Sequence, residues 1–88
     1  MPARLGVFPI RWEDLVIPRP GDVLVVDGRA SVQFADGRRL VFRVISVSPK
    51  PTYHGWAWLS GYVLDAAGDA IERREIFVRK EGLRRFQP

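Results

Sequence analysis

Short runs of β-branched, aromatic and other apolar residues, separated by turn residues, make up most of the chain after residue 20. Runs of this kind, bounded by Gly, Pro or Asp, predict β-strands. The predicted strands span residues 22–26, 31–35, 38–47, 56–64, 70–78 and 83–86. No segment shows helical periodicity, so the expected fold is all-β, either a sandwich or a small barrel of five to six strands. A barrel is favoured in 88 residues because closure removes exposed sheet edges.

Turn residues predict how these strands are connected. Asp36-Gly37, between "VQFA" and "RRLVF", is typical of a two-residue hairpin loop, which needs positive φ at both positions. "DAAGD" suits a longer loop with Gly68 in the left-handed conformation. The connection "SPKPTYHG" holds two prolines, which cannot donate to a sheet, so an irregular loop is expected there.

The beginning of the chain has a different character. Four prolines in the first twenty residues exclude a long helix. The expected organisation is an extended N-terminal arm over residues 1–20 that packs on a single domain over residues 21–88. The apolar residues expected to contact the domain are Phe8, Ile10, Trp12 and Leu15. No stretch resembles a signal peptide or a membrane span, which favours a soluble, cytoplasmic protein with no membrane partner.

The composition is that of a small globular domain without covalent reinforcement. Hydrophobic residues make up 47% of the chain, too many for a disordered segment. The absence of cysteine excludes disulfides, thiolate zinc sites and a cysteine nucleophile. The core must hold the fold alone, and so small a domain has a narrow margin of stability.

The net charge of +4 belongs entirely to the end of the chain. Residues 1–72 carry as many acidic as basic side chains, whereas residues 73–88 carry six basic ones against Glu75 and Glu81. These six predict a basic stripe that contacts nucleic acid: Arg73, Arg74, Arg79, Lys80, Arg84 and Arg85. The alternative is a solvated face, with glutamates at 72, 75 and 81 paired across strands, where ion pairs contribute little.

The stretch "TYHGWAWLSGY", residues 52–62, concentrates aromatic rings. Because side chains alternate across a strand, Trp56, Trp58 and Tyr62 share one face, and the other face is small and aliphatic. Gly61 in mid-strand permits a sharp bend. Two interpretations are open: the N-terminal arm covers the rings, or the rings form a platform on which bases or a peptide stack. Tyr53, in the preceding loop, is the ring least expected in the core.

No catalytic or metal-binding motif is found. His54 is the only histidine, without a cysteine or a nucleophile motif beside it, so a loop residue that hydrogen-bonds locally is expected. There is no glycine-rich phosphate loop, and the spacing of Asp65, Asp69 and Glu72 does not match a calcium-binding loop. We therefore expect no enzyme activity, no metal and no small-molecule cofactor.

One pattern in the second half of the chain resembles a set of short, uncharacterised actinobacterial proteins. The matching residues are Trp56, Trp58, Leu59, Gly61, Tyr62, Leu64, Gly68, Ala70, Arg73, Arg74, Ile76, Phe77 and Val78. The resemblance covers roughly residues 18–83 and implies no activity, since none is assigned to such proteins. The strand order also resembles an SH3-like barrel, a fold that binds nucleic acids, peptides and methyl-lysine alike and so cannot choose among functions.

The sequence thus predicts a non-enzymatic binding module. The leading hypothesis is nucleic-acid contact through the C-terminal arginines, with Tyr53, Trp56 and Trp58 as stacking rings. The alternative is a protein-interaction or homo-oligomeric assembly module that uses the aromatic face, because Trp, Tyr and Arg dominate interface energetics.

Overall fold

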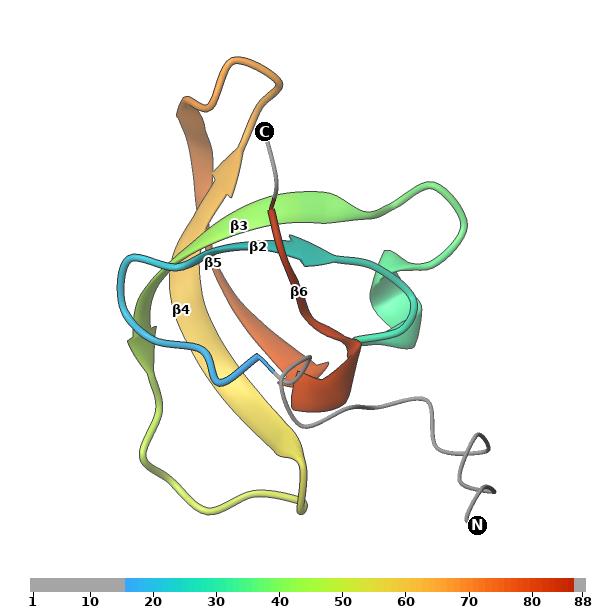
Figure 1. Cartoon of the computed structure of the whole chain (residues 1–88), viewed down its shortest axis with the longest axis vertical. Coiled ribbons are helices and arrows are strands. Elements are labelled where there is room, and N and C mark those ends of the chain that lie inside the picture. Colours follow the sequence, from blue (N-terminus) through green and yellow to red (C-terminus); the bar gives the residue numbers. More distant parts are fainter. Residues whose placement is uncertain (1–15, 87–88) are drawn as a thin grey trace, which may run out of the picture.

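The computed structural model describes residues 16–86, whose strands form one five-stranded antiparallel sheet. The strands are β2 (Val23–Val26), β3 (Leu40–Val47), β4 (Trp56–Leu64), β5 (Ala70–Arg79) and β6 (Arg84–Arg85). Their order in the sheet is β5-β4-β3-β2-β6 (Figure 1). Two 3-10 helices, η2 (Val32–Phe34) and η3 (Lys80–Gly82), follow β2 and β5. The predicted all-β class is confirmed, and β4 has the bounds expected from the sequence.

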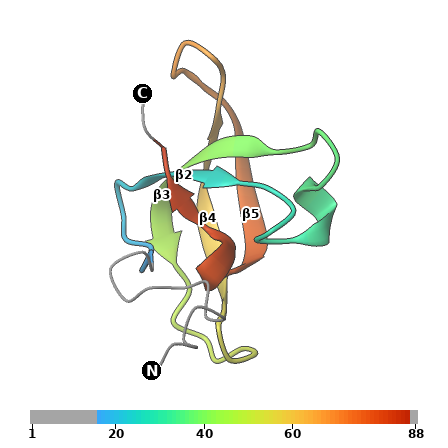
Figure 2. The ribbon, with the colours of Figure 1, turned by 45° about the vertical axis from the view of Figure 1, so that its right-hand side comes forward.

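The sheet curls strongly, but strand pairing does not close it in the described part of the chain. Its two edges are β5 and β6, and β6 pairs with β2 through only two residue pairs (Figure 2). Directly after Arg79 the helix η3 turns the chain away from β5, so β6 joins β2 instead. The end of β5 is held by loops: the N–H of Arg79 donates to the carbonyl of Ala30, and that of Lys80 to Gly55. The strand pairing of residues 16–86 therefore does not show the closure into a barrel that the sequence predicts.

The segment 31–35, predicted as a strand, is instead the helix η2 with its flanking residues. The hydroxyl of Ser31 accepts a hydrogen bond from the N–H of Gln33 at 3.4 Å, which caps the helix. Asp36 and Gly37 do have positive φ, 56° and 85°, as the turn prediction requires. No hairpin forms around them because both sides of β3, the strand that follows the turn, are already occupied, one by β2 and the other by β4.

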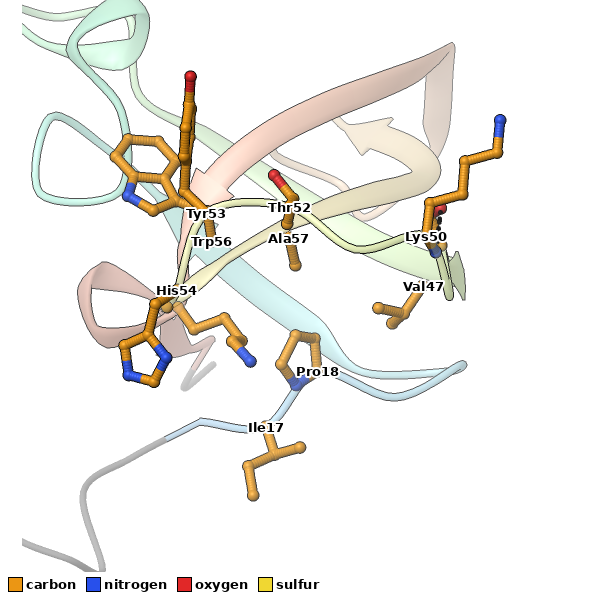
Figure 3. A pocket seen from close by; sticks show the side chains of 12 residues that line it. Ile17, Pro18, Val47, Lys50, Thr52, Tyr53, His54, Trp56 and Ala57 are labelled. Carbon is orange, nitrogen blue, oxygen red and sulfur yellow. Dashed lines mark hydrogen bonds between the residues drawn. The ribbon is translucent and has the colours of Figure 1, made fainter.

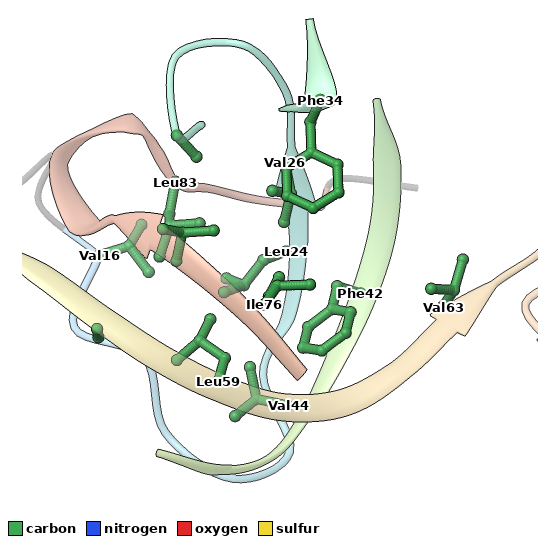
Figure 4. Packing of buried hydrophobic residues seen from close by; sticks show 13 residues of the cluster. Val16, Leu24, Val26, Phe34, Phe42, Val44, Leu59, Val63, Ile76 and Leu83 are labelled. Atoms are coloured by element: carbon green, nitrogen blue, oxygen red, sulfur yellow. The ribbon is translucent and has the colours of Figure 1, made fainter. Parts of the chain in front are cut away.

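The core shows which face of β4 is inside. Leu59 and Val63 of β4 are buried together with Phe42 of β3 and Ile76 of β5 (Figure 4). Leu24 of β2 points into the same cluster from the facing strand (Figure 4). The face that carries Trp56 and Trp58 therefore points away from the core. Burying these side chains is the main source of stability, because no described polar or charged side chain is buried among them.

Only the end of the predicted N-terminal arm is described. Val16 is 6% exposed and belongs to the core, and Pro18 is buried as well. The other residues expected to contact the domain, at positions 8, 10, 12 and 15, lie outside the described residues. Among residues 16–86 there is no helix of the length and apolar character that crossing a membrane requires.

Candidate binding face

Four aromatic rings meet on the outer side of the β4–β5 hairpin. Trp58 of β4 pairs directly with Phe77 of β5, and their ring centroids lie 5.0 Å apart. Trp56 also stacks on Phe77, with ring centroids 5.0 Å apart and an interplanar angle of 21°. Tyr53, from the loop before β4, approaches Phe77 at 6.4 Å. Offset contacts of this kind stabilise each ring pair by about 0.5–1.5 kcal/mol beyond simple burial. We call Tyr53, Trp56, Trp58 and Phe77 the aromatic face.

The rings of the aromatic face are not equally open. Trp56 is half-buried, and the guanidinium of Arg79 lies 5.5 Å from its ring centroid, which occupies one side of the ring. Trp58 remains 46% exposed and Tyr53 74% exposed. Large exposed rings in one cluster are uncommon on a small soluble domain. Trp58 and Tyr53 are therefore the two rings of this face on which a ligand can stack.

A shallow groove of about 390 Å³ runs between η2 and the aromatic face. Its walls are Ser31, Val32, Gln33, Trp56, Trp58, Arg74, Glu75 and Phe77. The groove thus combines an aromatic floor with one cation, one carboxylate and one amide.

A second hollow, of about 350 Å³, lies beside the loop that joins β3 to β4 (Figure 3). The rings of Tyr53 and Trp56 lie together on one side of it, whereas His54 points the opposite way (Figure 3). His54 is exposed, as expected of a loop residue. In the part of the chain that the structure describes, no cluster of His, Cys, Asp or Glu is suited to hold a metal ion.

Arginines flank the rings on the same face of the sheet. Arg79 pairs with Trp56 across β4 and β5, and Arg73 pairs with Tyr62 further along the hairpin. Arg43 of β3 lies opposite Tyr62 on its other side, with its guanidinium 5.9 Å from the ring centroid. We call Arg43, Arg73 and Arg79 the arginine flank. In these three strands the outer-face positions hold one acidic residue, Glu75, so this face is positively charged.

The structure does not gather the six predicted basic residues into one stripe. Arg84 forms an ion pair with Asp27, and Arg85 pairs with Asp22 at 3.1 Å, both at the junction of β6 and β2. Arg74 lies over the ring of Phe34 at 5.4 Å. Lys80 lines the hollow beside Tyr53. Only Arg73 and Arg79 of the six share the outer face with the rings.

The ion pairs also differ from the predicted alternative. Of the three glutamates expected to pair across strands, Glu81 lies 3.8 Å from Arg79, which is two residues away on the same chain segment. Glu75 accepts a hydrogen bond from the hydroxyl of Ser60 at 3.3 Å instead. The partners of the C-terminal arginines are the aspartates of the β2 region, which are far away in sequence.

We expect the double variant R84Q/R85Q to keep its nucleic-acid affinity and to lose a little stability. The two aspartates are only partly exposed, at 19% and 17%, so each broken pair lowers the free energy of unfolding by up to about 1 kcal/mol. Thermal unfolding and fluorescence anisotropy with a labelled oligonucleotide measure the two effects separately. A loss of affinity comparable to that of an R73Q/R79Q control would mean that Arg84 and Arg85 also contact the nucleic acid.

Sequence reasoning placed Tyr62 on this face but missed two of its residues, Phe77 and Arg43. The signal for Phe77 is the hairpin itself, because a loop centred between residues 67 and 68 sets Trp58 opposite Phe77. Cross-strand neighbours in an antiparallel pair lie close enough to contact each other directly. Arg43 could not be found in this way, because its position depends on the bulge in the β3–β4 pairing between Val44 and Ser46.

The chain matches no protein-family model, no curated protein and no solved structure. The resemblance to the actinobacterial proteins therefore stays a prediction.

Proposed function

We propose that this chain is a non-enzymatic binding module that contacts single-stranded nucleic acid through the aromatic face and the arginine flank. The observation that carries the proposal is that exposed Trp58 and Tyr53 both contact Phe77, on a sheet face that also presents three arginines. Bases stack on such rings with about 1–3 kcal/mol each, and arginines beside the rings contact the phosphates.

A single strand fits this face better than a duplex does. In a duplex the flat faces of the bases are already stacked on one another, so the rings of a β-sheet cannot reach them. The outer-face residues of β4 from Trp56 to Tyr62 are all at least partly exposed, with an arginine opposite each end of this stretch. Seven strand residues span about 20 Å at about 3.3 Å each, which accommodates a few nucleotides.

The affinity should depend on salt in proportion to the number of phosphate contacts. Three contacts from the arginine flank predict a log-log slope of about −2 for a single strand, and hence a loss of about 20-fold between 50 and 200 mM salt. Fluorescence anisotropy with labelled single-stranded RNA, single-stranded DNA and duplex DNA measures this slope. We expect micromolar binding of the single strands and weaker binding of the duplex.

Two results would contradict the proposal. The absence of binding to all three probes at 50 mM salt would exclude nucleic acid as the ligand. A duplex preference with a slope near −5 would instead implicate all six C-terminal basic residues as a stripe.

We propose, further, that the curled sheet is an SH3-like barrel. The support is the strand order β5-β4-β3-β2-β6, the helix η3 between the last two strands, and the contact of β5 with the loop at Ala30. Slow amide exchange of Arg79 together with the β2 and β3 amides would indicate one cooperative unit of this kind.

A protein-interaction or assembly module is the second candidate, and one observation favours it. Val32 is 81% exposed on the rim of the groove, beside the aromatic face. An apolar side chain in this position adds contact area for a protein partner but contributes little to a polyanion site. Sedimentation equilibrium tests the homo-oligomeric form: a dimer that dissociates in a V32E variant would support this candidate over the first.

A further inference from the structure

The groove beside Trp58 contains a carboxylate, which a surface that binds only phosphates does not need. Glu75 points out of the same face as Trp58 and Phe77 and lines the groove with them. A negative charge here repels the phosphate backbone, so its presence is a cost for unspecific binding of nucleic acid. The cost is offset if the carboxylate accepts hydrogen bonds from the ligand.

The carboxylate has the capacity for such bonds. Among the described residues, its hydrogen-bonding partner is Ser60, whose hydroxyl donates to Oε2 at 3.3 Å. An ionised carboxylate offers about four lone-pair sites, so Glu75 can accept from at least two more N–H groups. The hydroxyl of Ser60 also holds the carboxylate over the sheet, next to the ring on which a base would stack.

We propose that Glu75 selects guanine as the base that stacks on Trp58. This inference rests on the proposed function, and it assigns a base preference to the same site. Guanine presents two adjacent donors, N1–H and the 2-amino group, on one edge, and a carboxylate accepts both in parallel.

The other bases fit this arrangement less well. Uracil presents a single N–H between two carbonyl oxygens, which the carboxylate repels. Adenine presents one amino donor beside an acceptor nitrogen, and cytosine presents one amino donor beside two acceptors. Each of these bases leaves part of the charge of Glu75 without a partner, and an unpaired charged group in a partly desolvated groove is unfavourable. The expected order is guanine first and uracil last.

Inosine provides the sharpest test, because it differs from guanosine only by the absence of the 2-amino group. We expect the unmodified protein to bind an oligouridine with one central guanosine about fivefold more tightly than the same strand with inosine. In the E75Q variant, whose amide offers one acceptor in place of the carboxylate, the two strands should bind equally. The matched control is E72Q, which removes an exposed acid of the same strand that is absent from the groove and should keep the preference.

The possible results distinguish the preference for guanine from the proposed binding function on which it rests. Equal affinity of the unmodified protein for the guanosine, inosine and uridine strands would overturn the selection of guanine and leave the proposed binding function standing. No binding to any of these strands would overturn the proposed function itself. A guanosine preference that persists in E75Q would also overturn the role of Glu75. The comparison of strands uses the unmodified protein, so it does not depend on the folding of a variant.

Discussion

Replacing Trp58 with alanine should weaken binding of a single-stranded oligonucleotide by about 5- to 150-fold while leaving the fold intact. This range corresponds to the loss of one stacked base, about 1–3 kcal/mol. Trp58 is 46% exposed and points away from the core, so its removal costs little folding free energy compared with a buried ring. Anisotropy titrations of the variant and the unmodified protein, at one salt concentration, measure the change.

Two variants make this result specific to the aromatic face. Phe86 is a similarly exposed ring, 42%, outside this face, and F86A should bind as well as the unmodified protein. Trp56 is held between Phe77 and Arg79, so W56A should lower the melting temperature as well as the affinity. Equal affinities of W58A and the unmodified protein, with both folded by circular dichroism, would remove Trp58 from the site.

The local pattern of the sequence predicted the sheet better than it predicted the connections. The alternation in residues 56–64 placed Trp56 and Trp58 on one face, and only the packing of Leu59 against Phe42 and Ile76 shows that this face is outside. The aliphatic face fits inside because Phe42, Leu24 and Ile76 from the other strands already fill much of the interior. Alternation assigns side chains to two faces, but the choice between the faces depends on the other strands.

The segment around Val32 shows where local pattern fails. Val32 and Phe34 alternate as in a strand, yet Phe34 is buried and Val32 is 81% exposed. A strand needs a free edge to pair with, and β3, the strand across the turn, has none left once β2 and β4 are in place. The Asp36-Gly37 turn was predicted correctly in its φ angles, but a turn does not determine which strands it connects.

The charged residues of the candidate site could likewise be identified only from the tertiary structure. Arg84 lies 57 residues from Asp27, and nothing in the local sequence of either residue indicates the pair. The pairing of β6 with β2 creates this contact and that of Arg85 with Asp22, so two of the six predicted basic residues are neutralised far from the rings. Conversely, Arg43 adds a positive charge to the candidate site from β3, which lies outside the basic C-terminal segment.

Gly61 is the position at which a single added methyl group should most strongly destabilise the fold. A Cβ atom there would lie 2.1 Å from the carbonyl oxygen of Arg43 and 2.7 Å from the ring of Phe42. The carbonyl belongs to the β3 backbone, and the ring is fully buried, so neither can move aside at low cost. This close approach of β3 and β4 lies beside the bulge between Val44 and Ser46, where β4 bends across the core (Figure 1).

We expect G61A to lower the free energy of unfolding by about 3 kcal/mol, the upper end of the usual cost of overpacking. In a domain of this size that corresponds to a fall in melting temperature of about 12–24 °C. The matched control is G37A: its added Cβ meets no atom within 4 Å, but its φ of 85° disfavours alanine. That variant should lose only about 1 kcal/mol. Thermal unfolding of the two variants separates steric exclusion from backbone strain, and equal melting temperatures would mean that β3 and β4 can move apart at Gly61.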